Sequence, residues 1–390
     1  MTDTDITIIG GGIVGLTVAR GLLDNTDFSV TLIDNKLDHN KSQPVDFDAR
    51  VIALARRSVD ELRGWGVTLP ESVAIKHIEV TDKGAAGYCE LAAQNFNLSA
   101  FGEVVALQRL GETLYASVQN SRLQRVAAEV TDITTQPDCQ QLRLSDQATL
   151  KSKLVIVADG GSSPVSATLG FHYQQTAYQQ TAIICNVKVS EKHQYKAFER
   201  FTANGPLAFL PFTSSTDDEV QNEYSVVWTI AEDQAEQLLS FSDKQFIDAL
   251  QKAFGYRKGR ILTVGKKDAF PLALRQADKL TRHRSVVVGN AAQTLHPIAG
   301  QGFNLGVRDA VTLVDALKSV TDPGEFDVLN AYQQARRADR SATIGITDSL
   351  VTLFSNQLLP LQTARNLGLL SMNVSHAIQA LFVKQTTGLN

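Results

Sequence analysis

The sequence predicts an α/β protein that has a discontinuous parallel-sheet domain, an inserted antiparallel β-sheet and C-terminal helices. A β-branched run at residues 5–9 leads into a glycine turn and then into an apolar helical pattern, which is the order of a βαβ unit. Strand-like runs that end in glycine recur near residues 160 and 290. Residues 176–270 lie between those two segments and alternate as antiparallel strands do.

Composition narrows the class of protein. The 390 residues are 43% hydrophobic and 20% charged, which is enough for a large core and either two domains or one domain with an insertion. The net charge of −4 and the lack of a basic run argue against nucleic-acid binding. Cys89, Cys139 and Cys185 are too far apart in sequence for a CxxC pair or a metal site, so we expect inert thiols and no metal.

The sequence also bears on location. We expect neither a secretory signal nor a membrane-spanning helix, because no stretch approaches about 18 uninterrupted apolar residues. A cytoplasmic location is expected, with peripheral contact at the inner membrane as an open alternative.

The first forty residues form a Rossmann-like βαβ unit. Gly10 permits the tight turn, Gly12 lets the backbone approach a pyrophosphate, and Gly15 allows the helix to pack closely on the strand. Amides at the helix N-terminus would hold the pyrophosphate. Asp34 ends the second strand, where a carboxylate would accept hydrogen bonds from the ribose hydroxyls.

Two later segments favour FAD over a simple NAD site. A buried-strand pattern at 154–158 ends in Asp159-Gly160, and another at 285–288 ends in Gly289-Asn290. A glycine-rich loop follows at 296–306 and enters a helical pattern, so its amides and the positive end of the helix dipole suit an anionic ring such as reduced flavin. The candidate cofactor residues in this loop are Gly300, Gln301, Gly302 and Asn304.

These segments resemble, in order and spacing, the FAD-dependent aromatic-ring hydroxylases, the family that includes para-hydroxybenzoate hydroxylase. The resemblance covers nearly the whole chain. It implies that Asp159 and Gly160 serve FAD and the transient electron donor NAD(P)H, and that Gly289 and Asn290 bind the ribityl chain. Asn290 stands where the family has an acid, which predicts somewhat weaker FAD binding, and Ser166 stands where many relatives have an arginine.

Four further motifs resemble the ubiquinone-biosynthesis branch of this family: residues 48–54, 197–201, 205–208 and 289–297. The resemblance implies hydroxylation of a polyprenylated phenol, 2-polyprenyl-6-methoxyphenol, at ring position 4, with O2, NAD(P)H and a flavin C4a-hydroperoxide. It implies that Arg50 contacts FAD near its ribose and phosphates and that Gln108 lies near the cofactor. It also implies association with other ubiquinone-pathway proteins.

The positions of the motifs predict a discontinuous domain organisation. Residues 1–75, 98–175 and 270–345 are expected to form the FAD-binding domain, and residues 76–97 and 176–269 the substrate domain. Residues 346–390 are expected to form a C-terminal helical region. Its apolar residues between Leu350 and Val383 either pack on the FAD domain or form amphipathic helices that touch a membrane or a partner.

The chemistry requires a dry cavity and a substrate ring placed over the flavin. By family resemblance, the backbone at Pro297 borders the reactive edge of the flavin. His296 sits beside that loop and is a candidate base, and Arg200 and Tyr224 on expected pocket strands are candidates too. Two alternatives stay open: a hydroxylase of the same fold that acts on another ring position or an unprenylated phenol, and a non-catalytic flavin-bound subunit of a quinone-synthesis complex.

Overall fold

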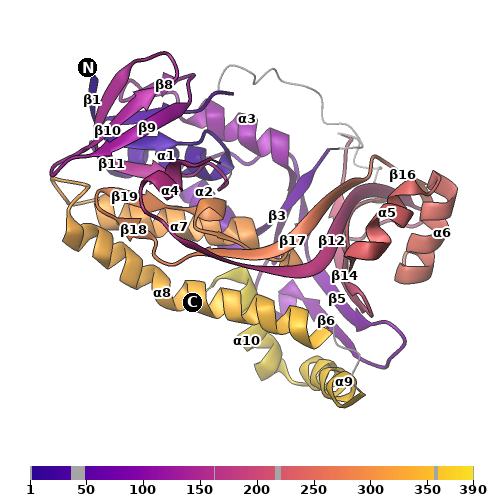
Figure 1. Cartoon of the computed structure of the whole chain (residues 1–390). Helices are drawn as coiled ribbons and strands as arrows, with labels where there is room; N and C mark the ends of the chain where they lie inside the picture. The colour runs from indigo at the N-terminus through magenta and orange to yellow at the C-terminus, as the bar shows by residue number, and fades with distance from the viewer. Residues whose placement is uncertain (1, 37–48, 162, 216–220, 355–358, 390) are drawn as a thin grey trace.

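The predicted βαβ unit lies at the centre of a mostly parallel sheet in the computed structural model (Figure 1). The structure describes residues 2–36, 49–161, 163–215, 221–354 and 359–389. In this first sheet β1 pairs in parallel with β2 on one side and with β11 on the other, and the path runs β18-β19-β11-β1-β2-β8. Its elements are β1 (Thr2–Ile9), α1 (Ile13–Asn25), β2 (Val30–Ile33), β8 (Leu123–Val126), β9 (Val130–Thr135), β10 (Gln140–Leu144), β11 (Thr149–Val157), β18 (Thr281–Arg282) and β19 (Ser285–Val287).

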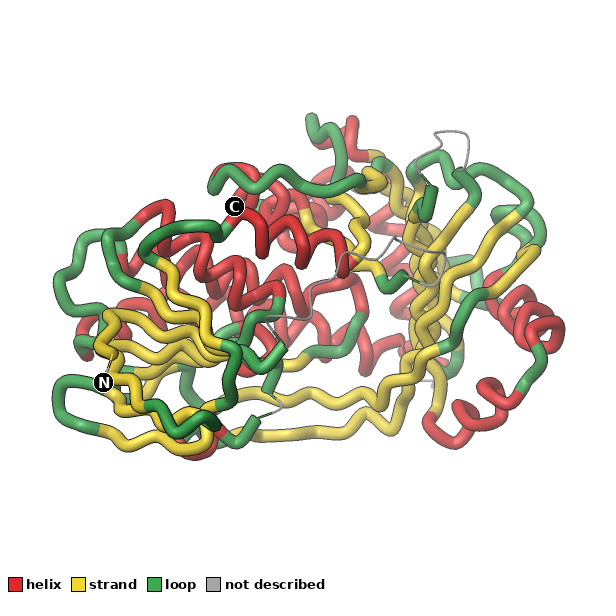
Figure 2. Tube along the Cα trace, turned by 90° about the horizontal axis from the view of Figure 1, so that it is seen from above, coloured by secondary structure: helices red, strands yellow, loops and turns green. Residues whose placement is uncertain are grey.

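The inserted region forms a second, mainly antiparallel sheet. Its path is β20-β17-β12-β15-β14-β13-β5-β6, and β16 also pairs with β12. Two long strands of this sheet, β12 and β17, run from one part of the molecule to the other (Figure 2). The strands are β5 (His77–Asp82), β6 (Tyr88–Ala92), β12 (Tyr173–Val189), β13 (Lys196–Thr202), β14 (Gly205–Phe212), β15 (Glu223–Ala231), β16 (Ile261–Val264), β17 (Asp268–Ala277) and β20 (Gln293–Thr294).

The two faces of this second sheet have different neighbours. Phe198, Phe209 and Trp228 point to an outer face, where they pack with Phe246 under α5 (Glu232–Ser240) and α6 (Asp243–Phe254). The inner face points the other way, because alternate residues on a strand face opposite sides. There Asn186 donates a hydrogen bond from Nδ2 to the backbone oxygen of Ala49, at 2.7 Å. The inner face therefore looks toward the segment that precedes β3.

A third, small sheet with its flanking helices joins the two larger sheets. Its path is β3-β7-β4, and α2 and α3 follow β3 and β7 directly. The bounds are β3 (Val51–Ala55), α2 (Arg56–Gly64), β4 (Ser72–Ile75), β7 (Gly102–Ala106) and α3 (Leu107–Ser117), with short helical turns η2 (Ala93–Phe96), η3 (Gly289–Ala291), η4 (Ile298–Gly300) and α4 (Val165–Thr168).

The C-terminal part is helical, and it contacts both larger parts of the molecule. It consists of α7 (Gln301–Leu317), α8 (Phe326–Phe354), α9 (Leu359–Val374) and α10 (His376–Thr387), so the expected boundary at residue 346 falls inside α8. Arg365 of α9 pairs with Asp82 of β5 at 2.6 Å, and both side chains are buried. Residues 355–358 of the apolar series and Asp48 of the first ubiquinone-branch motif lie outside the described residues. Within the described part, no helix is both long and apolar enough to cross a bilayer.

Candidate active site

The three motif positions of the first glycine turn, Gly10, Gly12 and Gly15, differ in how closely other atoms surround them. Gly10 and Gly15 are tightly packed, and Gly12 is not. Gly10 has φ +109°, and a Cβ there would lie 2.6 Å from the oxygen of Ala158. A Cβ on Gly15 would lie 2.0 Å from the oxygen of Gly10, so the close packing of α1 on the turn requires glycine. A Cβ on Gly12 would meet no atom within 4 Å. Gly12 therefore borders open space at the N-terminus of α1, where the sequence predicts a pyrophosphate.

Asp34 lies at the end of β2, beside this turn, as the sequence predicts. Its Oδ2 accepts a hydrogen bond from the Gly11 amide at 2.6 Å, and its Oδ1 accepts one from the Lys36 amide at 2.7 Å. A carboxylate has about four acceptor positions, so these two bonds leave capacity for ribose hydroxyls. The same side chain thus fixes the turn and can receive the nucleotide.

The Asp159-Gly160 turn lies against the Gly289-Asn290 turn. Asp159 Oδ1 accepts a hydrogen bond from the Gly161 amide at 2.8 Å, and Ser163 donates its hydroxyl to the other carboxylate oxygen. A Cβ on Gly161 would lie 3.1 Å from the Asn290 backbone oxygen, which brings together segments about 130 residues apart in sequence. Gly160 has φ +76° and, like Gly12, borders open space.

An arginine that the sequence did not single out lies beside these two turns. The guanidinium of Arg275 covers the ring of Tyr173 at 3.5 Å, and a Cβ on Gly161 would meet it at 2.5 Å. Ser166, which replaces the arginine of many relatives, is buried in α4. A cation is therefore present near Asp159, supplied by β17 and not by the segment that follows Gly160.

Asp309 of α7 holds the Gly289 turn in place. It is fully buried and accepts hydrogen bonds from the Gly289 amide at 3.1 Å and from Gln293 Nε2 at 3.0 Å. Arg336 of α8 pairs with it at 2.7 Å, so the buried charge is compensated. Asn290 itself is exposed beside the turn and available to a ligand hydroxyl.

The loop at 296–304 ends in the N-terminus of α7. Gly300 has φ +60° and precedes the helix, and no side chain caps its first turn. A Cβ on Gly302 would meet no atom within 4 Å. Asn304 binds the backbone of β3 through Ala53 and Ala55, at 3.0 and 2.8 Å, and Gln301 donates to the Thr386 oxygen at 3.2 Å. Through these hydrogen bonds the side-chain amides of Asn304 and Gln301 fix the loop against the backbone of β3 and α10. The two side chains therefore position the loop.

The two remaining cofactor candidates meet at the start of the third sheet. The Leu107 amide donates a hydrogen bond to the Arg50 backbone oxygen at 2.9 Å, which places Arg50 next to Gln108. Both side chains are exposed. The glycine turns that border open space, the uncapped N-termini of α1 and α7, and these polar side chains fit a dinucleotide such as FAD.

His296 is completely buried beside the loop and is uncharged. Its Nδ1 accepts a hydrogen bond from the Ile298 amide at 3.2 Å, and its Nε2 has no partner among the described residues. Burial lowers the pKa of His296 to about 4. The ring meets Tyr178 edge to face at 5.4 Å, and Tyr178 donates to Asp348 at 3.3 Å. A neutral imidazole with a free Nε2–H is a hydrogen-bond donor at neutral pH.

Arg200 and Tyr224 point away from His296. Arg200 donates from Nε to the Ala253 oxygen of α6 at 3.1 Å, and Tyr224 is buried in the apolar cluster of the outer face. Their positions in the strands direct both side chains to the outer face. This orientation argues against the expected role of Arg200 and Tyr224 as a base beside the flavin. Alternation on β13 directs Glu199, the residue before Arg200, to the inner face.

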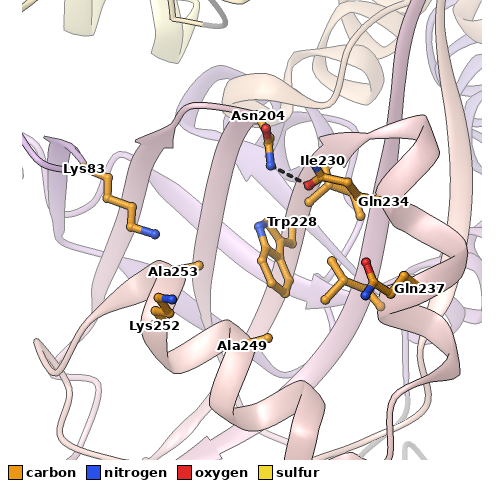
Figure 3. A pocket seen from close by; sticks show the side chains of 10 residues that line it. Lys83, Asn204, Trp228, Ile230, Gln234, Gln237, Ala249, Lys252 and Ala253 are labelled. Atoms are coloured by element: carbon orange, nitrogen blue, oxygen red, sulfur yellow. Dashed lines mark hydrogen bonds between the residues drawn. The ribbon is translucent and has the colours of Figure 1, made fainter. Parts of the chain in front are cut away.

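A pocket of about 450 Å³ also opens on the outer face (Figure 3). Its lining includes Lys83, Trp228 and Lys252, from the sheet side and from α6. None of the glycine turns lines this pocket, so it is separate from the cofactor site.

This fold and its glycine segments define a FAD-dependent aromatic-ring monooxygenase, the class that uses NAD(P)H and O2. The chain belongs to the FAD binding domain family (FAD_binding_3), whose model matches residues 3–345. The expected cofactor and enzyme class are confirmed.

Similar proteins extend over the whole chain. It is 32% identical to the ubiquinone hydroxylase UbiL of Rhodospirillum rubrum, over 98% of this chain and 89% of that protein. It is 30% identical to 3-demethoxyubiquinol 3-hydroxylase of Escherichia coli, over 99% of both chains. Among solved structures, p-nitrophenol 4-monooxygenase PnpA of Pseudomonas putida has a TM-score of 0.77 at 16% identity over 100% of both chains, which supports the fold.

Proposed function

We propose that this protein hydroxylates the ring of a polyprenylated phenol in ubiquinone biosynthesis. The observation that carries the proposal is the full-length similarity to two proteins that are both named as hydroxylases of ubiquinone or a ubiquinone precursor. The motifs at 48–54 and 197–201, which resemble the ubiquinone-biosynthesis branch, support the same conclusion.

Two ring positions are candidates. The first is position 4 of 2-polyprenyl-6-methoxyphenol, which the resemblance of the sequence motifs favours. The second is the position implied by the name of the Escherichia coli relative, a 3-hydroxylase of 3-demethoxyubiquinol, which aligns over 99% of both chains. Isotope-resolved product analysis with each precursor separates the two.

The residues of this chain have defined tasks in such a reaction. FAD, when bound, supplies reduction by NAD(P)H and activation of O2. The turns at Gly12, Gly160 and Gly289 would hold it, and the amides at Gly300 to Gly302 would favour negative charge on its ring. The resemblance places the backbone at Pro297 beside the reacting edge, and His296 is the residue before it. The inner face of the second sheet would form the wall on the substrate side and help to exclude water.

The substrate's prenyl tail suggests collection from a membrane. Several apolar side chains on α9 and α10 are exposed, among them Leu367 at 59%, Val374 at 84% and Leu381 at 69%. Residues 349–390 contain no aspartate or glutamate, so this surface does not repel anionic lipid headgroups. We propose that this face rests on the bilayer while the substrate enters. Association with other ubiquinone-pathway proteins is proposed from the resemblance alone.

The direct test uses purified, FAD-loaded protein with NAD(P)H, O2 and 2-farnesyl-6-methoxyphenol. We expect a product that gains one oxygen atom on the ring, detected by mass spectrometry, and no product with Gly12→Val. Oxidation of NAD(P)H that yields only hydrogen peroxide with every phenol offered would contradict the proposal. Bound FAD that is never reduced would favour the alternative, a non-catalytic flavin-bound subunit of a quinone-synthesis complex.

A further inference from the structure

Glu199 lies on the inner face of β13, and the residue as a whole keeps partial exposure. Its Oε1 is closed to solvent and has no hydrogen-bond partner among the residues that the structure describes. Ala197 and Phe201, the neighbours on the same face of β13, belong to an apolar cluster that also contains Ile298. Burial of a carboxylate in such surroundings is costly unless a ligand or a proton compensates it.

Glu199 lies within a row of paired residues across the sheet, which runs from Val80 of β5 to Asp268 of β17, an acid that is ion-paired to Lys266. Cross-strand pairs connect Glu199 to Ala208, Ala208 to Val227, and Val227 to Ile184. Residues paired in this way share one face of a sheet. The three apolar residues keep partial exposure, whereas their neighbours along each strand are buried. Partly exposed apolar side chains therefore continue the row from Glu199 across the inner face.

This row lies on the face of the sheet that is turned toward the cofactor segments. Ile298, which packs in the same cluster as Phe201, comes directly after His296 and Pro297 in the loop that precedes α7. The hydrogen bond from Asn186 to Ala49 fixes another part of the inner face beside Arg50. The segments on both sides of the row thus contact the loop and the segment that are assigned to the flavin.

The other titratable groups near this face have partners of their own or are neutral. Asp82 of β5 pairs with Arg365 of α9, and Tyr178 of β12 donates to Asp348 of α8. His296 is neutral because burial lowers its pKa. Burial raises the pKa of Glu199 to about 7. At neutral pH the carboxyl group is therefore divided between its acid and its base form, as a general base requires.

We propose that Glu199 binds the ring hydroxyl of the phenol substrate and accepts its proton. The inference rests on the proposed function, since it takes a phenol as the substrate. In this step the phenol O–H bond breaks, the proton passes to the Glu199 carboxylate, and the electron pair stays on the phenol oxygen. The carboxylate becomes a neutral acid and the phenol becomes a phenolate, whose ring reacts more readily with an electrophilic oxygen.

Binding of a probe pair tests the contact without turnover. FAD-loaded protein at pH 8 is titrated with 2-farnesylphenol and with its methyl ether, which cannot donate a hydrogen bond, and the flavin absorbance is followed. We expect the wild type to prefer the phenol by about ten- to a hundredfold, the range for a hydrogen bond to a charged group. The preference should fall to a few-fold in Glu199→Gln.

Turnover and its pH profile test the proton transfer. Glu199→Gln should lose hydroxylation by about 10²- to 10⁴-fold, the usual contribution of general-base catalysis, while it retains the visible flavin spectrum. The rise of kcat/KM through pH 7 should disappear in this variant and return in Glu199→Asp at a reduced rate. Glu79→Gln is the matched control, because Glu79 lies on the neighbouring strand, is ion-paired to Arg257 and sits on the outer face.

The outcomes separate the two proposals. A wild type that hydroxylates the phenol, with an unchanged rate and phenol preference in Glu199→Gln, overturns the role of Glu199 and leaves the proposed function intact. A Glu199-dependent preference for the phenol without any hydroxylated product overturns the proposed function and supports the phenol contact. Glu199→Gln could also lose both the preference for the phenol and bound FAD, while Glu199→Asp and Glu79→Gln keep both. That result would indicate a structural role of Glu199 and would overturn the catalytic one.

Discussion

The two glycines at the start of α1 provide the sharpest prediction, because the same turn constrains them in different ways. In Gly12→Val the new side chain meets open space, since a Cβ at this position has no protein atom within 4 Å. The backbone at Gly12 is extended, with φ −70° and ψ 177°, and valine adopts it without strain. We expect the free energy of unfolding of the FAD-free protein to fall by only about 1 kcal/mol, the cost of a poor residue before a helix.

FAD binding should respond very differently. The valine side chain fills the space in which the pyrophosphate would approach the amides of α1, so we expect at least about a hundredfold loss of affinity, or about 2.7 kcal/mol. Gly15→Ala is the counterpart, because its Cβ would lie 2.0 Å from the Gly10 oxygen and the backbone must move. That substitution should reduce the free energy of unfolding by about 3 kcal/mol or more.

The assay combines urea unfolding of the FAD-free proteins with titration of FAD followed by its visible absorbance. The account requires a stable Gly12→Val protein that does not become yellow, and a destabilised Gly15→Ala protein. Wild-type FAD affinity in Gly12→Val would refute the assignment of this turn to the pyrophosphate.

Three further predictions concern buried charges. Burial raises the pKa of Glu199 from 4.5 to about 7, so the folded protein binds this proton more tightly than the unfolded chain. The free energy of unfolding should therefore fall by about 3 kcal/mol between pH 4.5 and 7. Urea unfolding of Glu199→Gln at different pH values should lack that decline. Burial lowers the pKa of His296 from 6.5 to about 4, so its effect has the opposite sign. The free energy of unfolding should fall by about 3 kcal/mol as the pH is lowered from 6.5 to 4. In His296→Gln the free energy of unfolding should depend less on pH in this range. Arg365→Met leaves Asp82 buried without its cation and should destabilise the protein by about 3–5 kcal/mol, with faster proteolysis of the C-terminal helices; wild-type resistance would mean that the pair does not hold α9 in place.

Local patterns in the sequence predicted the parts of the fold that depend on local geometry. The turn at Gly10 to Gly15, the strands that end near Gly160 and Gly289 and the helix after Gly300 are specified by short runs of residue types, and the structure places them as predicted.

The orientation of pocket side chains could not be predicted in this way. Whether Glu199 or Arg200 faces the inner side depends on the register of β13 with β14 and β5, and a shift of one residue exchanges the two faces. The parallel pairing of β13 with β5 joins segments more than 100 residues apart, which no local pattern indicates. The role of Asp309 beneath Gly289 likewise depends on how α7 folds back against η3.

The central claim, ring hydroxylation in ubiquinone synthesis, is tested most directly by the quinone-precursor profile of bacteria that lack this protein and grow with oxygen. We expect mass spectrometry to detect accumulation of a 2-polyprenylphenol or its 6-methoxy derivative, or of a demethoxy precursor if the second ring position is correct. Wild-type protein should restore the normal profile, and Gly12→Val should not. An unchanged profile with normal ubiquinone would contradict the account and assign the enzyme to another phenol.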